Sequence, residues 1–374
     1  MSPLKLSYVS LARLPTDRAH GYASMKMCEE FATLGTQVEL LVPTRRFGIK
    51  NDPFEYYKIK RVFSLDRLFA TDFLGRLENS RVAFAIDQLT FLFSLWMRTF
   101  RHKIVYTRDY QVALFARSKY IVLEVHSVPE REFLFLQAVR RARRIIVISN
   151  GLKRLLVANG VPESKVLVAP DAVDLSEFDI TPSREVWRAH HVDQQKRIVL
   201  YTGHFYGWKG ADTLAHAAAS FPPYVELVLM GGVGQELADF QKSYKSPHVH
   251  VIGFQPREHI ASFLMSADVL VLPNSARPKI SSHYTSPLKL FQYMASSVPI
   301  VASDVPSIRE ILTDESTFWF APDDERSLAR IIEHVLTHPD EAREKAARAR
   351  EEVKKYTWGS RARAILAHLA KKPT

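Results

Sequence analysis

Cysteine is nearly absent from this chain of 374 residues, in which Cys28 is the single example. One cysteine excludes an internal disulfide and any zinc site made of several thiolates, and it fits a reducing compartment. The apolar spacing of "MKMCEEFA" indicates a helix around Cys28. We therefore interpret this thiol as a small buried apolar group, with a nucleophilic role as the alternative.

Long hydrophobic runs are missing as well. The most apolar segment, "QLTFLFSLWM" at residues 88–97, is half as long as the roughly 20 residues that a membrane-spanning helix needs. The amino-terminal "MSPLKLSYVSLARLP" lacks the uninterrupted apolar core of a signal peptide and predicts a strand instead. We therefore expect a cytoplasmic protein that is either soluble or bound peripherally to the inner face of a membrane.

Acidic residues are too few to balance the basic ones, which leaves a net charge of +11. Residues 1–180 hold 27 Lys and Arg against 19 Asp and Glu, while residues 181–374 hold 24 against 21. An anionic membrane surface or a phosphorylated acceptor would suit the basic first half. We predict no nucleic-acid partner, because zinc-finger, RRM and basic-zipper patterns are lacking. A plain solvated basic surface is the alternative.

Apolar strands alternate with helical patterns along the whole chain. One set runs from "KLSYVSL" to "KVLVAP" and a second from "RIVLYTG" to "PIVASD", with a polar stretch at residues 172–196 between them. Such runs are typical of parallel strands buried on both faces, and their alternation with helices predicts doubly wound α/β domains. We predict two Rossmann-like domains, at residues 1–175 and 176–358, and a final helix at 359–374 that is free to cross back onto the first. Ligands bind beyond the carboxyl ends of such strands, so we expect the site in the cleft between the domains.

Three strand-to-helix turns of the second domain are compatible with a phosphate. In "YTGHFYGWKGADTL" the strand ends at Gly203, His204 lies at its tip, and Lys209 adds a charge to the positive end of the next helix. The Walker order G-x-x-x-x-G-K-[ST] is absent. An ordinary turn with a solvated lysine is the alternative.

The second turn, "LVLMGGVGQELADF", brings Gly231, Gly232 and Gly234 to a strand end. Its spacing fails the dinucleotide fingerprint G-x-G-x-x-G, because residue 237 is Leu. On its own this cluster predicts a tight turn.

The third turn, "HYTSPLKLFQYMASSVPIVASD", predicts a helix with Ser286 as its N-cap and Pro287 as its first residue. The free N–H groups of Leu288 and Lys289 would then form an anion site from backbone alone. Gln292 lies one turn further along, where its amide could hydrogen-bond a ribose. A capped surface helix with a polar stripe is the alternative.

These segments resemble glycosyltransferase family four, whose members are retaining enzymes with the GT-B fold. The strongest matches are "TGHFYGWKGADTL", "LMGGVG", "VHVIGFQPREHIASFLMSADVLVLPN" and "SPLKLFQYMASSVPIVASDVPSIREIL". Weaker matches are "RAHGYASMKMCEEFATLGTQVELLVP" and "VISNGLKRLLVANGVPESKVLVAPDAVDLSEF". The resemblance implies an α/β fold of the GT-B class, with two doubly wound Rossmann-like domains facing a central cleft. It also implies a nucleotide-sugar donor and, as we infer, a lipid-linked or polysaccharide acceptor.

The resemblance further implies roles for single residues. Lys209 matches the family's lysine at the donor diphosphate, and His204 stands where the family has an arginine. His126 in "LEVHSVPE" fits a histidine near the reacting sugar, with a hydrogen-bonded core histidine as the alternative. His20 and Gly21 match a loop near the phosphates.

We therefore predict His126 and Lys209 as catalytic residues. The predicted donor site comprises Gly21, Gly203, His204, Lys209, Gly232, Phe254, Tyr284, Ser286, Leu288, Lys289 and Gln292. The sequence contains no D-x-D triplet, so we predict no metal and no cofactor besides the donor substrate.

Departures from the family pattern keep other functions open. The family has an acidic pair eight residues apart, where this chain has Tyr284 and Gln292. The change suits a catalytically silent sugar-nucleotide-binding partner of another transferase, or another GT-B enzyme such as a sugar-nucleotide epimerase or phosphorylase. A related subset of the family carries "SPLKLFEYMA", from which this chain departs only at Gln292, and this favours an active enzyme. We interpret Glu310 as a helix-face charge and Asp109 as the partner of Arg108.

Overall fold

The chain forms two compact units. The computed structural model describes residues 4–44, 49–73, 80–98, 100, 103–129 and 132–371. Unit 1 contains residues 1–148, 152–169 and 358–374, and unit 2 contains residues 149–151 and 170–357. The last helix therefore belongs to unit 1, although all of unit 2 precedes it in the sequence.

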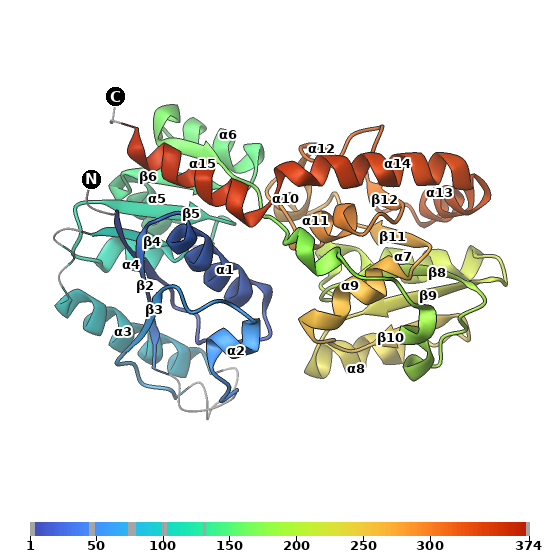
Figure 1. The fold of residues 1–374 in the computed structure, drawn as a ribbon, viewed down its shortest axis with the longest axis horizontal. Coiled ribbons are helices and arrows are strands. Elements are labelled where there is room, and N and C mark those ends of the chain that lie inside the picture. The colour runs from blue at the N-terminus through green and yellow to red at the C-terminus, as the bar shows by residue number, and fades with distance from the viewer. Residues whose placement is uncertain are drawn as a thin grey trace. The chain divides into compact units, whose positions relative to one another are not determined.

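Unit 1 is built on a parallel sheet whose described strands have the order β3-β2-β1-β4-β5-β6-β7 (Figure 1). They are β1 (Lys5–Val9), β2 (Gln37–Pro43), β3 (Ser64–Leu68), β4 (Ile104–Thr107), β5 (Ile121–Val125), β6 (Arg144–Val147) and β7 (Val166–Val168). Every residue of β4, β5 and β6 is buried, because helices cover both faces of a parallel sheet.

Helices connect these strands. They are α1 (Ala19–Thr33), α2 (Pro53–Tyr57), α3 (Arg81–Met97), α4 (Tyr110–Phe115), α5 (Glu132–Arg141), α6 (Asn150–Ala158), α15 (Trp358–Ala370) and the short η1 (Glu163–Lys165). Helix α3 begins after Ser80, whose hydroxyl accepts a hydrogen bond from the Ala83 amide at 3.2 Å. Helix α15 packs beside α1, where the rings of Trp358 and Tyr22 meet edge to face with centroids 6.0 Å apart.

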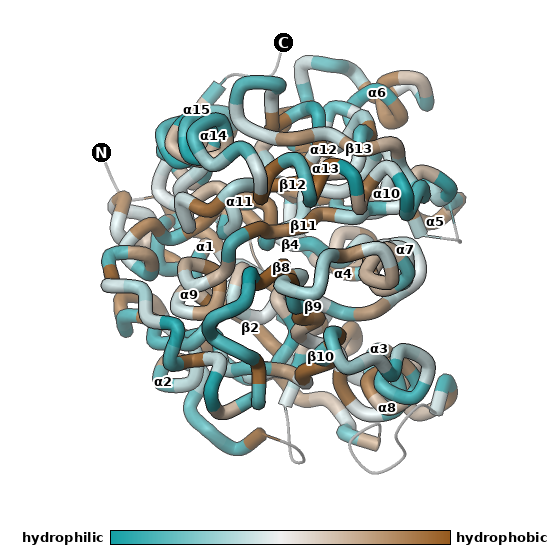
Figure 2. Tube along the Cα trace, turned by 90° about the vertical axis from the view of Figure 1, so that its right-hand side faces the viewer, coloured by the Kyte–Doolittle hydropathy of each residue, from teal (hydrophilic) through white to brown (hydrophobic). Residues whose placement is uncertain are grey.

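Unit 2 is built on a second parallel sheet, with the order β10-β9-β8-β11-β12-β13 among the described residues. Its strands are β8 (Arg197–Thr202), β9 (Val225–Met230), β10 (Val249–Ile252), β11 (Val269–Leu272), β12 (Ile300–Ser303) and β13 (Phe318–Phe320). Strand β11, with the sequence VLVL, lies at the hydrophobic end of the colour scale in Figure 2 and is fully buried.

The helices of unit 2 cover this sheet. They are α7 (Ala211–Ala217), α8 (Gly234–Ser243), α9 (Arg257–Met265), α10 (Lys279–Ser282), α11 (Leu288–Ala295), α12 (Pro306–Arg309), α13 (Glu325–Thr337) and α14 (Pro339–Glu352). Shorter turns are η2 (Leu175–Phe178), η3 (Arg184–His190), η4 (Gly207–Lys209), η5 (Ala218–Ser220) and η6 (Val353–Lys355). Trp187 is fully buried and packs against Phe263, with ring centroids 5.0 Å apart.

The predicted doubly wound parallel sheets are confirmed. In each sheet the direction in which strands are added reverses once, between β1 and β4 in unit 1 and between β8 and β11 in unit 2. Ligands of such sheets bind where loops leave the carboxyl ends of the strands on either side of this reversal. Within the described ranges, no helix is both long and apolar enough to span a bilayer.

Candidate functional site

The loops after β8 and β11 meet at the strand reversal of unit 2. The Ser275 amide and the Ser281 hydroxyl both donate to the Trp208 carbonyl, at 3.1 and 3.0 Å. Gly210 adopts a φ of +72°, and a Cβ there would lie 1.7 Å from the Pro273 carbonyl oxygen. Only glycine fits this close approach. The turn after β8 is therefore fixed against the loop that leads to α11.

Lys289 buries its amino group at the meeting point of these loops. The residue is 8% exposed, and no described residue offers its Nζ a hydrogen-bond acceptor. Nζ lies 3.7 Å from the centroid of the Tyr201 ring and 3.4 Å from the position that a Cβ on Gly203 would take. Burial, and after it the charge of Lys209, holds the pKa of Lys289 well below its usual range. Since a buried cation without an anion is costly, this position is suited to an anionic ligand.

Lys209, one of the predicted catalytic residues, lies in η4 just before α7. It is half-buried, with Nζ 5.4 and 5.3 Å from the ring centroids of Tyr206 and Trp208. Burial lowers the pKa of Lys209, although the charge of Glu236 opposes this shift. Lys209 and Lys289 are thus two neighbouring amino groups, and neither is paired with a carboxylate among the residues that the structure describes.

His204 is held by Glu236, an acid that the sequence analysis missed. Nδ1 of His204 lies 3.0 Å from one oxygen of Glu236, and the other oxygen accepts a hydrogen bond from the Phe205 amide at 2.5 Å. The His204 ring also stacks on Tyr206, with centroids 5.0 Å apart. Only Nε2 of His204 is left to face a ligand. The position of Glu236 directly after the glycine turn of β9 is the sequence feature that could have indicated it.

The predicted N-cap of α11 is wrong by one residue. Pro287 takes the N-cap position, the helix begins at Leu288, and no side chain caps it. The Ser286 hydroxyl instead accepts a hydrogen bond from the Asp171 amide at 3.1 Å. The amides of Leu288 and Lys289 have no acceptor among the described residues and are free to bind an anion.

The remaining predicted donor residues of unit 2 differ in their surroundings. Tyr284 and Gln292 are half-buried, and neither side chain has a hydrogen-bond partner in the described part of the chain. Phe254 follows β10 and is 46% exposed. Gly232 serves packing, because a Cβ there would lie 2.7 Å from the Phe205 ring. The Gln292 amide and the Phe254 ring are therefore available to a ligand.

A cavity of about 620 Å³ opens at the strand reversal of unit 1. His20 and His126 both line it. Gly21 instead faces Tyr57, whose hydroxyl leaves no room for a Cβ. Burial, followed by the charge of Arg108, lowers the pKa of His20 to about 4, so this imidazole is neutral near pH 7.

Both ring nitrogens of His126 are occupied inside unit 1. Nε2 lies 2.5 Å from Glu124, and Nδ1 lies 2.7 Å from the Arg108 guanidinium. Because a guanidinium only donates, Nδ1 accepts and the ring proton faces Glu124. These contacts match the alternative of a hydrogen-bonded histidine, and the catalytic role of His126 stays a prediction.

Glu310 and Asp109 both accept hydrogen bonds from backbone amides. Glu310 accepts hydrogen bonds from the Asn150 and Gly151 amides of the same unit, at 2.7 and 3.1 Å, so it is more than a helix-face charge. Burial raises the pKa of Asp109, while the hydrogen bond from the Leu11 amide at 2.7 Å, and after it the charge of Arg108, lower it; Arg108 also contacts His126. Both acids hold backbone in place.

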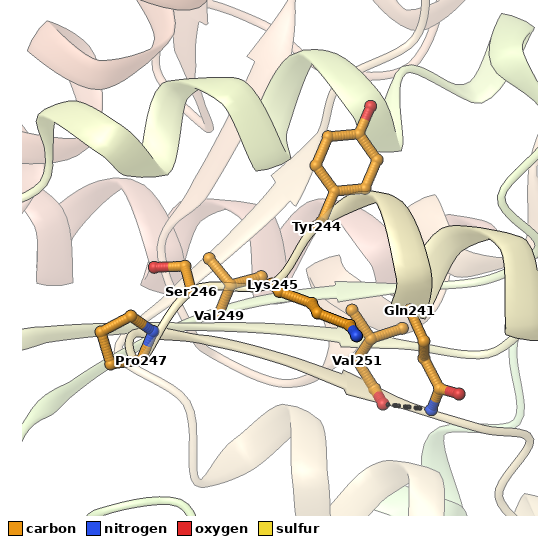
Figure 3. Close-up of a pocket in the computed structure, with 7 residues that line it drawn as sticks. All are labelled: Gln241, Tyr244, Lys245, Ser246, Pro247, Val249 and Val251. Atoms are coloured by element: carbon orange, nitrogen blue, oxygen red, sulfur yellow. Dashed lines mark hydrogen bonds between the residues drawn. The ribbon is translucent and has the colours of Figure 1, made fainter.

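A separate hollow of about 470 Å³ lies between α8 and the edge strand β10 (Figure 3). The Gln241 amide donates to the Val251 carbonyl beside it, at 3.0 Å (Figure 3). The loop into the amino end of β10 forms much of its wall, and β9 separates β10 from β8. This hollow therefore lies apart from the strand reversal that holds Lys289.

The sequence matches two family models. Residues 24–177 match the model described as Glycosyltransferase Family 4, and residues 183–356 match the model described as Glycosyl transferases group 1. Together these matches cover most of both units. The chain belongs to glycosyltransferase family 4.

Named relatives of this family 4 chain are distant. The D-inositol 3-phosphate glycosyltransferase of Kineococcus radiotolerans is 27% identical over 258 residues, which make up 62% of this chain and 57% of the relative. The alpha-maltose-1-phosphate synthase of Mycolicibacterium smegmatis is 27% identical over 243 residues, or 59% of this chain and 61% of the relative. The match therefore spans less than two thirds of either relative.

A solved structure shares the fold of the family 4 chain. HepE from Anabaena, in complex with UDP-glucose, is similar with a TM-score of 0.76 at 16% identity, over 98% of this chain and 99% of that one. This likeness confirms the predicted GT-B fold.

Proposed function

We propose that this family 4 chain is a retaining glycosyltransferase that moves a sugar from a nucleotide-sugar to a lipid-linked or polysaccharide acceptor. One observation carries the donor class: the buried ammonium of Lys289 has no partner among the described residues. A diphosphate supplies the missing negative charge. Lys209 and the free amides of the first turn of α11 supply further contacts of the same kind.

The proposed reaction breaks a glycosyl–phosphate bond. Negative charge grows on the leaving diphosphate while positive charge grows on the sugar. Lys209, Lys289 and the α11 amides stabilise that state more than the ground state, because their charges face the group on which charge develops. The acceptor hydroxyl attacks from the side of the leaving phosphate, which takes the hydroxyl proton. This route retains the anomeric configuration and needs no strong carboxylate base.

Three observations support a choice of nucleotide and acceptor. HepE was solved with UDP-glucose, which makes a UDP-sugar the first donor to test. The unpartnered amide of Gln292 supports a ribose contact one turn from the diphosphate. The basic first half of the chain supports an acceptor at an anionic surface, and synthesis of a cell-envelope polysaccharide or glycolipid is the matching role.

A thermal-shift screen against UDP-, GDP-, ADP- and dTDP-sugars tests the donor class. We expect one donor to raise the Tm of the wild-type protein. Lys289→Met and Lys209→Ala should lose most of that shift while staying folded. Lys242→Met, at an exposed lysine of α8, is the matched control and should keep it. Four donors without effect on the wild type, or a full shift in Lys289→Met, would show that the diphosphate assignment is wrong.

Tyr284 and Gln292, in place of the family's acidic pair, favour a second candidate function. This is a catalytically silent partner that binds a nucleotide-sugar for another transferase. Slow release of nucleotide from the donor without acceptor, reduced by Lys209→Ala, indicates an active enzyme. Donor binding with no release, alone or with acceptors, indicates the silent partner.

A further inference from the structure

Helix α3 has a buried apolar face and an exposed apolar face. Phe91, Leu92 and Leu95 are buried and pack in the core of unit 1. The opposite face carries a row of exposed side chains that we call the α3 stripe. Its members and their exposed fractions are Val82 (69%), Ile86 (38%), Leu89 (62%), Phe93 (64%), Trp96 (46%) and Met97 (61%).

The spacing of the α3 stripe is that of one helix face, since its members recur every three or four residues from Val82 to Trp96, with Met97 beside Trp96. A helix that is apolar on both faces is normally buried on both. Contiguous exposed apolar surface of this kind marks an interaction site. Figure 1 shows α3 on the outside of unit 1.

Segments beside α3 extend this apolar surface. The Ser94 hydroxyl donates to the Phe69 carbonyl at 2.7 Å, which places the 59% exposed Phe69 next to the helix. The Phe73 amide donates to Asp87 at 2.9 Å, and Phe73 is 45% exposed. Aromatic side chains therefore continue the stripe across the segment that precedes α3.

The exposed charges on α3 and in the segment after α4 are basic, whereas Asp66 of the neighbouring β3 is 51% exposed and lies 3.8 Å from Arg98. Arg81, Arg117 and Lys119 are exposed, and the Arg117 guanidinium lies 5.1 Å from the centroid of the Trp96 ring. The acids between residues 80 and 120 are Asp87 and Asp109. Both bind inward-facing backbone amides, as described above for Asp109 and through Phe73 for Asp87. The exposed surface thus combines apolar side chains with cations.

We propose that the α3 stripe docks unit 1 onto a lipid bilayer that contains anionic headgroups. Apolar side chains enter the interface between headgroups and acyl chains, while Arg81, Arg117 and Lys119 meet the phosphates. A second copy of this chain fits less well, because a two-fold contact through the stripe would bring the same cations face to face.

The docked helix also lines the cavity of unit 1, through Phe84, Asp87, Gln88 and Phe91. A sugar carried on a lipid in that bilayer would be presented beside the cavity. This part of the inference rests on the proposed function and makes the acceptor a membrane-anchored glycolipid. The docking itself does not depend on the donor site, which lies in unit 2.

Vesicle sedimentation of the full chain tests the docking. We expect binding to vesicles of phosphatidylcholine with phosphatidylglycerol, weaker binding at high salt, and little binding to phosphatidylcholine alone. The double variant Leu89→Glu/Phe93→Glu should bind at least about tenfold less, because it removes two large apolar side chains from the interface. Val62→Glu, at a 50% exposed position of unit 1 outside the stripe, should bind like the wild type.

A charge variant separates the two contributions. Arg117→Gln/Lys119→Gln should lose part of the binding and most of its salt dependence. No sedimentation of the wild type with anionic vesicles at low salt overturns the proposal, as does unchanged binding of Leu89→Glu/Phe93→Glu. A dimer that this variant dissociates, without vesicle binding, would show that a second copy covers the stripe.

The donor-induced thermal shift distinguishes this proposal from the proposed function. It should be the same in the wild type and in Leu89→Glu/Phe93→Glu, since both positions lie in unit 1. If Leu89→Glu/Phe93→Glu loses vesicle binding but keeps the donor-induced rise in Tm, the substitutions act on membrane docking and not on the donor site. If the wild type binds vesicles but no donor raises its Tm, the result counts against the proposed donor site and leaves the docking proposal intact.

Discussion

Arg361 donates a hydrogen bond to Glu124 at 2.9 Å, although 237 residues separate them in the sequence. Arg361 is 5% exposed and Glu124 is 2% exposed. Burial alone would raise the pKa of Glu124, but Arg361, followed by His126, holds it well below its usual range. Helix α15 thus supplies the cation that keeps this carboxylate charged, and Glu124 in turn holds His126 at the wall of the unit 1 cavity.

Arg361→Met should destabilise unit 1 strongly. The substitution leaves Glu124 buried without its main counter-charge, and breaking a buried ion pair in this way costs about 3–5 kcal/mol. Urea unfolding followed by circular dichroism measures the change. Arg363→Met, at an exposed position of the same helix, is the matched control and should change stability by no more than about 0.5 kcal/mol. Equal, small losses of stability in both variants would mean that the Glu124 carboxylate does not depend on the charge of Arg361.

His20 should make the protein less stable in mild acid. Its folded-state pKa of about 4 lies below the ordinary value of 6.5, so the unfolded chain binds more protons between these values. The stability that neutral His20 contributes is complete above pH 6.5 and is lost as the pH falls toward 4. His20→Gln should therefore flatten the fall in Tm between pH 6.5 and 4. His259→Gln, at an exposed histidine of α9, is the control and should leave the plot of Tm against pH unchanged. If the plot for His20→Gln ran parallel to that of the wild type, the His20 imidazole would not be buried as described.

The sequence was sufficient for the two sheets because buried parallel strands require apolar runs, and these runs are visible in the chain. It also placed the phosphate-compatible turns at the correct strand ends, since glycines and a helix start mark them locally. Ser286 does not cap α11, and its hydroxyl instead binds the amide of Asp171, which is far away in the sequence. Local capping preferences contain no information about such a partner.

Two further features depend on contacts that no local pattern encodes. A lysine on the polar face of a short helix is normally solvated, whereas Lys289 is buried against Tyr201 by the loop after β8. The partner of Glu124 comes from the far end of the chain. The segment 88–97 is visibly apolar in the sequence, but only the structure shows that one face of its helix is exposed.

Lys289→Met should raise stability in the absence of donor. The variant keeps the length of the side chain and removes an amine that has no partner among the described residues. A gain on the order of 1 kcal/mol is expected, because the cost of burying an uncompensated polar group is removed. Urea unfolding without ligand measures it, and Lys242→Met should show no gain. Combined with a lost donor shift, this result would mark Lys289 as a residue kept for binding; a loss of stability would mean that its ammonium is already compensated.

Donor binding should take up a proton. The pKa of free Lys289 is held well below its usual range, and a bound diphosphate stabilises the charged form. Above the lowered pKa the amine is neutral before binding and charged after it, so donor affinity falls as the pH rises through that value. Calorimetry in buffers of different ionisation enthalpy detects the uptake. Lys289→Arg, which stays charged, should bind donor without it, and equal uptake in both proteins would assign the proton to another group.

Gln292→Glu should tighten nucleoside binding if residue 292 faces the ribose. A carboxylate accepts a stronger hydrogen bond from a ribose hydroxyl than an amide does, and a gain of about tenfold in affinity is expected. The new charge lies one turn from Lys289 and would weaken its hold on a diphosphate. Calorimetry should therefore use the free nucleoside, which lacks phosphate, beside the nucleotide-sugar.

Gln195→Glu, at an exposed turn before β8, should leave both affinities unchanged. Weaker binding of the sugar nucleotide together with unchanged binding of the nucleoside would place residue 292 beside the phosphates and remove it from the ribose.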